Sequence, residues 1–273
     1  MLTLIPNERA LLLVNREGKK YLIIADLHIG FERELAQKGL KVPSKTVDLI
    51  NRIRYLATKH EVSDLLILGD VKHTVTGFST EELGDLIYFF HSIEYYFDEI
   101  KIICGNHDGD LAGLVSTSKV EVIDSRGLTV IDSRGRIIGF VHGHAWPSYK
   151  VLNSDILIMA HIHPVVELRD SLGFKFNEAV WIRAPVNRER LMASFFRWAG
   201  INRGERLGGK VKLREVIVMP AFNEYLGGLA INKHLGEDMR SPLLNSGGVI
   251  LDNAEVFLLD GTYLGKLSFL AML

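Results

Sequence analysis

The segment DLLILGD, residues 64–70, is a run of apolar residues that ends abruptly in a glycine and an aspartate. The runs YLIIAD at 21–26 and IKIICGN at 100–106 have the same form, a short apolar stretch followed at once by polar residues. Apolar runs of this length, set between segments with helical periodicity, are typical of buried strands in βα units. The sequence therefore predicts parallel strands in the first half of the chain.

The stretches between these runs carry helical signals. Residues 43–60 space their apolar residues near the helical period. Residues 79–97 begin with a capping-box pattern, Ser79 or Thr80 followed by Glu82 or Leu83. We expect a helix in each stretch.

After about residue 117 the pattern changes to short strands joined by polar turns. One helix, predicted over 187–200, interrupts these strands, and the apolar segment 264–273 is predicted to be a buried terminal strand. No linker separates the two halves. We therefore expect two sheets that share one core.

Composition limits the classes of protein that the chain can belong to. Of its 273 residues, 47% are apolar and 24% are charged, which excludes a disordered chain. The net charge of −1 gives no overall attraction to nucleic acid or membrane. A single cysteine, Cys104, excludes an internal disulfide, and no signal peptide or membrane span is recognisable. We expect a soluble, cytoplasmic protein.

Histidines gather directly after the predicted strands. Seven of the ten histidines follow five apolar runs: His28, His73, His107, His142, His144, His161 and His163. Acidic and amide residues accompany them at Asp26, Asp70, Asn106 and Asp108. Because the carboxyl ends of parallel strands converge on one crevice, side chains from distant parts of the sequence can meet there.

Mixed imidazole and carboxylate donors are typical of sites for Mn, Fe, Co or Zn. The candidate donors are Asp26, His28, Asp70, Asn106, His142, His161 and His163. A single catalytic ion rarely takes so many protein ligands, because an open position must remain. Two ions that share Asp70 would use all seven donors, and a pair about 3.5–4 Å apart suits activation of hydroxide against a phosphoryl group.

Each of these residues also has an ordinary interpretation. Asp26 and Asp70 could each cap a helix, and the Gly-Asn pair before His107 could be a simple turn. Their joint occurrence after five strands favours the metal site. We expect His161 and His163 to reach one pocket together, because side chains two residues apart in an extended segment point to the same side.

The ordered set DLH, GD, GNHD, HGH and AHIHP, from Asp26 to His163, resembles the calcineurin-like metallophosphoesterase superfamily, whose pattern is D-x-H, G-D, G-N-H-D/E, H and G-H-x-H. The resemblance implies an α/β fold of four layers, αββα, in which helices cover two central mixed sheets. It also implies a single domain over residues 1–273.

The resemblance further implies a role for each matched residue. Asp26, His28 and His163 would hold one divalent ion. Asn106, His142 and His161 would hold a second ion, and Asp70 would bridge the two. His107 would be the catalytic histidine and Asp108 would orient it by accepting its other ring proton. The ions are expected to be Mn²⁺, with Fe, Zn, Co or Ni as alternatives, and a hydroxide that bridges them would attack phosphorus.

Some positions depart from the family pattern. Ala160 stands where many members have glycine, and His73 and His144 are additional histidines. We assign both to substrate contact or to a position behind the ligands, with a simple surface or structural role as the alternative. The segments ADLHIGFE, LGDVKH, MPAFNEYLGG and SPLL are similar to the ICC-like branch of archaeal and bacterial phosphoesterases, which includes ligase-associated enzymes. We expect Asn223, in the third of these segments, to lie in a loop near the site and contact substrate, with an ordinary turn as the alternative.

The substrate is less constrained by the sequence. Residues 183–215 are rich in Lys and Arg, around a helical insertion expected at about 185–212. Its basic and aromatic residues are Arg188, Arg190, Arg197, Arg203, Arg206, Phe195, Phe196 and Trp198. They could form a rim for a phosphodiester backbone, or a surface helix with a solvated basic face and inward aromatics.

Three functions are compatible with these residues. The first is a phosphodiesterase or nuclease that acts on nucleotides or single-stranded nucleic acid. The second is a phosphomonoesterase or pyrophosphohydrolase that acts on a small metabolite. The third, an inactive scaffold of the same fold, predicts lost ligands, whereas every expected ligand is present. The sequence predicts no membrane partner and leaves the oligomeric state open.

Overall fold

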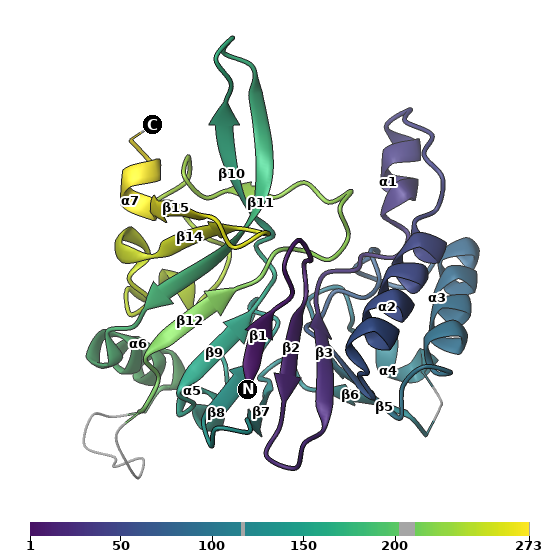
Figure 1. Ribbon diagram of the computed structural model, residues 1–273, viewed down its shortest axis with the longest axis horizontal. Helices are drawn as coiled ribbons and strands as arrows, with labels where there is room; N and C mark the ends of the chain where they lie inside the picture. Colours follow the sequence, from purple (N-terminus) through teal and green to yellow (C-terminus); the bar gives the residue numbers. More distant parts are fainter. Residues whose placement is uncertain (116–117, 202–210, 273) are drawn as a thin grey trace.

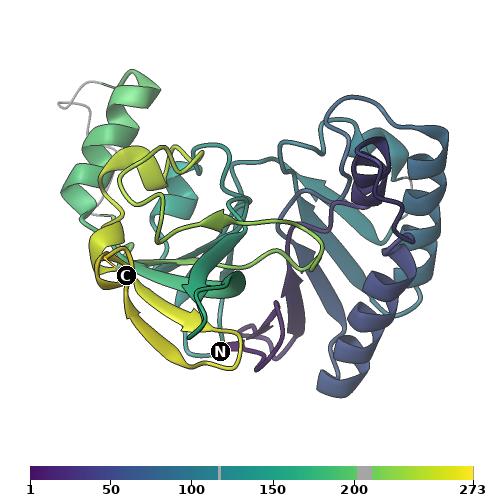
Figure 2. The same ribbon diagram turned by 90° about the horizontal axis from the view of Figure 1, so that it is seen from above.

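The computed structural model describes residues 1–115, 118–201 and 211–272. In these residues, two β-sheets face each other at the centre of the molecule and helices cover their outer faces (Figure 1, Figure 2). The predicted α/β fold with two mixed sheets and outer helices is confirmed.

The first sheet has six strands in the order β1-β2-β3-β4-β5-β6. They are β1 (Leu2–Leu4), β2 (Leu11–Val14), β3 (Lys20–Ile24), β4 (Asp64–Ile67), β5 (Glu99–Ile103) and β6 (Val120–Ile123). From β3 to β6 neighbouring strands are parallel, whereas β2 is antiparallel to β3 and β1 is antiparallel to β2. The carboxyl ends of β3, β4 and β5 therefore lie side by side on one edge.

Two long helices cover the outer face of this sheet (Figure 2). The helices of this half are α1 (Phe31–Gln37), α2 (Thr46–His60), α3 (Thr80–Ile93) and α4 (Leu111–Leu114). The predicted cap of α3 is confirmed, because Ser79 accepts a hydrogen bond from the Glu82 amide at 3.1 Å. The Glu82 carboxylate instead accepts from the amides of His73 and Thr74, and so fixes the loop after β4.

The second sheet has nine strands, seven of them in the order β13-β10-β11-β12-β9-β8-β7, with β14 beside β11 and β15 beside β14. They are β7 (Leu128–Ile131), β8 (Ile137–Phe140), β9 (Ile156–Met159), β10 (Pro164–Arg169), β11 (Lys175–Pro185), β12 (Glu215–Val218), β13 (Leu229–Ala230), β14 (Glu255–Leu258) and β15 (Tyr263–Lys266). The strands β8, β9 and β12 are parallel neighbours, so their carboxyl ends also share an edge.

Short helices cover the outer side of this second sheet (Figure 1). They are α5 (Tyr149–Leu152), α6 (Arg188–Ala199), η1 (Leu244–Ser246), η2 (Leu251–Asn253) and α7 (Leu267–Leu270). The helix predicted over 187–200 is confirmed as α6. The predicted terminal strand is wrong over its second half, because Leu267 and Leu270, three residues apart, are both buried on one face of α7.

Apolar side chains fill the space between the two sheets. The first sheet contributes residues such as Leu13 and Leu66, and the second contributes Phe140, Ile158 and Trp181. Further apolar layers lie outside each sheet, beneath the helices. This arrangement fixes the sheets relative to each other and so fixes the two sets of strand ends. In the described parts of the chain, every helix falls short of the length and apolar character that a membrane span requires.

The layer between the sheets can be tested at a position remote from the strand ends. Leu13→Ala is expected to lower the free energy of unfolding by about 2–5 kcal/mol, because it leaves a cavity in a close-packed layer. Urea denaturation followed by circular dichroism measures this loss. The same substitution at Leu172, which is 81% exposed, should change stability by no more than about 0.5 kcal/mol. Equal losses in the two variants would contradict this view of the core.

Candidate metal centre

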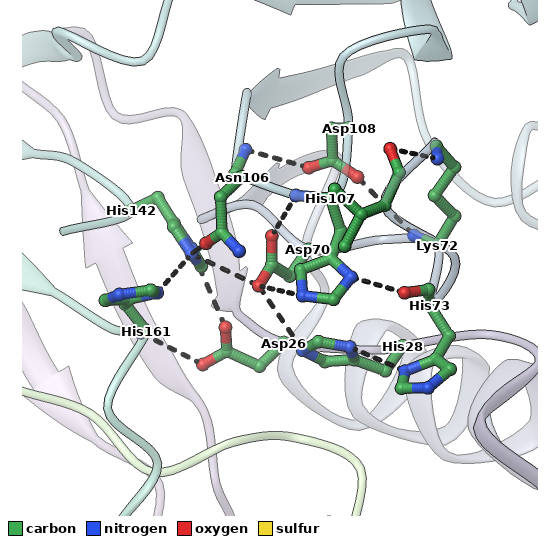
Figure 3. Close-up of polar contacts among 12 residues, drawn as sticks. Asp26, His28, Asp70, Lys72, His73, Asn106, His107, Asp108, His142 and His161 are labelled. Carbon is green, nitrogen blue, oxygen red and sulfur yellow. Dashed lines mark hydrogen bonds and ion pairs between the residues drawn. The ribbon is translucent and has the colours of Figure 1, made fainter. Parts of the chain in front are cut away.

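Polar residues from five loops converge where the carboxyl edges of the two sheets meet (Figure 3). Loops after β3, β4 and β5 come from the first sheet, and loops after β8 and β9 come from the second. The structure brings together all seven side chains that the sequence singled out as donors: Asp26, His28, Asp70, Asn106, His142, His161 and His163.

Five of these donors have a left-handed backbone, which is uncommon for residues other than glycine. Their φ angles are 54° at Asp26, 42° at His28, 50° at Asp70, 76° at His161 and 44° at His163. Such conformations cost on the order of 1–3 kcal/mol each and cluster at functional sites. The extended segment expected for His161 and His163 is therefore wrong: β9 ends at Met159, and the two histidines reach the site through strained turns.

Two glycines allow the strand ends to approach each other closely. A Cβ atom on Gly105 would lie 2.1 Å from Oδ1 of Asp70, and one on Gly69 would lie 2.5 Å from Nδ1 of His142. Gly69 also has a φ of +76°. The glycines of the GD and GN motifs are therefore required by the packing of the donors.

The first group of donors consists of Asp26, His28 and His163. The atoms Oδ1 of Asp26, Nε2 of His28 and Nε2 of His163 are all buried, and none has a hydrogen-bond partner among the described residues. Nε2 of His163 lies 3.4 Å from Oδ1 of Asp26. Buried polar atoms are almost always paired, so three unpaired lone-pair atoms facing one point indicate a place for a cation.

The second group of donors surrounds Nε2 of His142. Oδ2 of Asp70 lies 3.3 Å from this nitrogen, Nδ1 of His161 lies 3.0 Å from it, and Oδ1 of Asn106 lies 3.3 Å from it. The same Asp70 oxygen lies 3.4 Å from Nε2 of His28 in the first group. Asp70 thus stands between the two groups, which together match a pair of metal sites with a shared carboxylate (Figure 3).

Backbone carbonyls set the proton positions of three of the histidines. Nδ1 of His142 donates to the carbonyl of Leu68 at 2.8 Å, and Nε2 of His161 donates to the carbonyl of Arg240 at 3.0 Å. Nδ1 of His163 contacts the carbonyl of Gly227 at 3.4 Å. In each ring the other nitrogen faces the donor groups, the arrangement that metal-binding histidines use.

The charges within the site shift its pKa values. Burial alone would raise the pKa of Asp26, but the neighbouring His163 and His142 outweigh burial and hold it below its ordinary value. Asp70 is held well below its ordinary pKa in the same way, against its burial, by His142 and His28. Burial would lower the pKa of His142, yet Asp70 and Asp26 raise it to about 9. Burial and the charged His142 lower the pKa of His161 to about 4.

His107 lies beside both groups without joining either. Its Nδ1 donates to the backbone carbonyl of His73, and its Nε2 lies 3.9 Å from Oδ2 of Asp70 (Figure 3). The predicted contact between Asp108 and the His107 ring is wrong. The Asp108 carboxylate is buried and accepts from the amides of Val71, at 2.9 Å, and Gly105, at 2.9 Å. It therefore joins the loops after β4 and β5.

The three predicted substrate contacts have different outcomes. His73 uses both ring nitrogens on protein partners, so it lies behind His28 and the predicted substrate contact is wrong. Asn223 is 2% exposed, and its amide group bonds to backbone atoms of Leu27 and Tyr225, so its predicted substrate contact is also wrong. The ring of His144 lies 5.2 Å from that of His142, and its substrate contact stays a prediction.

The basic segment at 183–215 is described only in part. Arg203 and Arg206 lie outside the described residues. On α6, Phe195 is buried and Trp198 is 53% exposed, with both rings packed near Trp146. The inward aromatic packing of Phe195 agrees with the surface-helix interpretation, whereas Trp198 remains accessible.

A cavity of about 400 Å³ opens onto the donors. It is lined by donors from both groups, by His107, and by Gly227, Gly228 and Arg240. Sequence reasoning missed Arg240, although the adjacent SPLL segment had been noted as similar to the ICC-like branch. Ser241, the first residue of that motif, donates to the carbonyl of Gly143 at 2.7 Å and so holds Arg240 beside the second group.

Comparison with solved structures finds this fold in nuclease MPE of Pseudomonas putida. The match has a TM-score of 0.51 at 18% identity and covers 95% of this chain and 98% of that chain, so the likeness is one of fold. YfcE, a phosphoesterase from E. coli, gives a TM-score of 0.34 at 16% identity over 55% of this chain and 74% of that chain. Vps29 from Entamoeba histolytica, complexed with zinc, gives 0.25 at 17% identity over 55% and 68%. Comparisons of the sequence with family models and with curated proteins found no match.

Metal binding at this site is expected to release protons at neutral pH. His142 has a pKa of about 9 and is protonated there, whereas a ligand nitrogen must be bare. Calorimetric titration with Mn²⁺ at about pH 7 should therefore give an apparent enthalpy that varies with the ionisation heat of the buffer. The release should fall as the pH rises through about 9, because His142 is then already neutral. An enthalpy that is the same in every buffer would contradict this expectation.

Proposed function

We propose that this chain is a dinuclear metal-dependent phosphoesterase, a single domain of the calcineurin-like metallophosphoesterase superfamily in its ICC-like branch. The observation that carries the proposal is the unpaired, buried set of lone pairs on Asp26, His28 and His163, with Asp70 set between this group and the second. The donor chemistry fits Mn²⁺, and Fe, Zn, Co or Ni as alternatives.

From the two groups we infer a ligand set for each ion. Asp26, His28 and His163 would hold one ion, Asn106, His142 and His161 the other, and Asp70 would bridge. When bound, two such ions activate water and neutralise charge on a phosphoryl group. The histidine rings already turn a nitrogen toward each ion site, so the side chains need little rearrangement, and His142 would lose its proton when an ion binds.

We propose that His107 acts on the substrate itself. Its Nδ1 is held by the His73 carbonyl, so its Nε2 faces the cavity beside Asp70. From there it can stabilise a phosphoryl oxygen or give a proton to the leaving oxygen. Asp108 supports this arrangement through the backbone of the two neighbouring loops.

As substrate we propose a phosphodiester in a nucleotide or in single-stranded nucleic acid. Support comes from the open cavity and from the fold that this chain shares with a nuclease. A small phosphomonoester or pyrophosphate is the second candidate, because the same donors serve that chemistry equally well. Retention of every expected ligand argues against an inactive scaffold.

Hydrolysis assays test the proposal directly. With Mn²⁺, the wild type is expected to hydrolyse bis(p-nitrophenyl) phosphate and single-stranded DNA, while Asp70→Asn, which lacks the bridging carboxylate, should not. His107→Asn should lower kcat by about 10²–10⁴-fold while Mn²⁺ still binds.

If the wild type shows no hydrolysis above the Asp70→Asn level with any of the candidate metals, the proposed phosphoesterase activity is refuted. Hydrolysis of p-nitrophenyl phosphate but not of the diester or DNA would favour the phosphomonoesterase over the phosphodiesterase.

Arg240 is expected to bind the anionic substrate at the mouth of the cavity. Arg240→Ala should raise KM about tenfold with a smaller change in kcat, because a charge-assisted hydrogen bond to phosphate contributes about 1.5–3 kcal/mol. Arg240→Lys should have a KM between those of the wild type and Arg240→Ala, since lysine keeps the positive charge but lacks the planar guanidinium group. Arg190→Ala, on the exposed face of α6, is the matched control for loss of a surface cation. A KM raised equally by Arg190→Ala would assign binding to the basic segment instead.

A further inference from the structure

We propose that Glu34, on α1, is a positioning residue that acts through His73 to fix the proton of His28 on Nδ1, and thereby keeps Nε2 of His28 bare for the metal. This inference rests on the proposed metal site. It assigns a function to α1, which contributes none of the donors and projects from the first sheet (Figure 1).

Three side chains form a continuous line of hydrogen bonds. Oε2 of Glu34 lies 2.8 Å from Nε2 of His73. Nδ1 of His73 lies 3.2 Å from Nδ1 of His28, a contact visible in Figure 3. Nε2 of His28 then faces Oδ2 of Asp70 at 3.4 Å and has no hydrogen-bond partner among the described residues.

The order of donors and acceptors in this line follows from Glu34. An ionised carboxylate can only accept, so Nε2 of His73 must carry the hydrogen. A neutral His73 then has its lone pair on Nδ1 and must accept there, which requires His28 to donate from its own Nδ1. His28 is left with a lone pair on Nε2, the nitrogen that faces Asp70. The opposite order would put a hydrogen on that nitrogen and block a metal ion.

The structure holds His73 and α1 in place for this task. The His73 amide donates to the carbonyl of Ile29 at 3.0 Å and contacts the Glu82 carboxylate at 3.1 Å. The ring of Phe31, at the start of α1, stands edge-on to His73 with centroids 5.2 Å apart. The buried Glu32 accepts from the Lys45 amide and so anchors α1 to the start of α2.

The two oxygens of Glu34 have separate partners. Oε1 pairs with Lys38 one turn along α1, while Oε2 faces His73. Exposed pairs of the first kind contribute little to stability. The contact with His73 is therefore the one that couples α1 to the donors, and Glu34→Gln tests it with little change in shape. A glutamine side chain can donate as well as accept, so it no longer forces His73 to donate from Nε2 and His28 to donate from Nδ1.

Tautomers in the metal-free protein give the most direct test. Nitrogen NMR of ¹⁵N-histidine-labelled protein, at about pH 8 where free imidazoles are neutral, should show hydrogen on Nδ1 of His28 and on Nε2 of His73. In Glu34→Gln a mixture is expected for both residues. Glu61→Gln, at an exposed partner of Lys20, is the matched control and should leave the tautomers unchanged. A His28 protonated on Nε2 in the wild type, or unaltered tautomers in Glu34→Gln, would overturn the inference.

Metal affinity provides a second readout. Stepwise Mn²⁺ binding followed by electron paramagnetic resonance should show one of the two binding steps weakened about 10–100-fold in Glu34→Gln, with the other step little changed. In a His73→Phe background, Glu34→Gln should have no further effect, because the line is already broken. The same additional weakening in that background would refute action through His73. If the wild type binds no Mn²⁺, the proposed function fails, and the tautomers still decide the role of Glu34.

Discussion

The carboxylate of Asp70 joins the two halves of the site. Oδ2 contacts Nε2 of His28 from the first sheet and Nε2 of His142 from the second, at 3.4 and 3.3 Å. Oδ1 accepts from the His107 amide at 3.0 Å, so the same side chain also sets the position of the candidate acid. Nothing larger than glycine at position 105 would leave space for it. The positions of both donor groups therefore depend on one buried anion.

The strained turns that carry the donors are supported by hydrogen bonds between adjacent strand ends. The Asp26 amide donates to the carbonyl of Gly69 at 3.1 Å, and the His28 amide donates to the carbonyl of Asp70 at 2.9 Å. The Asp26 carboxylate in turn accepts from the His161 amide at 3.3 Å. These bonds offset part of the cost of the left-handed backbone in the turns. Each one pairs a buried polar group that would otherwise be left unsatisfied where the strand ends.

Much of this arrangement follows from local sequence. Apolar runs that end in Asp, His or Asn predicted both the parallel strands and the donors, because the ends of such strands must share an edge. Asp108 and Asn223 were misjudged because buried backbone groups compete for their side chains, and sequence spacing carries no record of that competition. Glu34 and Arg240 reach the site from a helix and a loop remote in sequence, so their roles depend on packing that only the folded chain defines.

Each donor group draws on both sheets. Asp26 and His28 share the first group with His163, and Asp70 and Asn106 share the second with His142 and His161. An ion in either group would thus add a link between two layers that hydrogen bonds already join at this edge, such as those from His161 to Asp26 and from His142 to Leu68. The free energy of metal binding would therefore contribute to the free energy of packing between the two sheets. Removing the ions with a chelator would weaken the contact between the sheets as well as abolish metal-dependent hydrolysis.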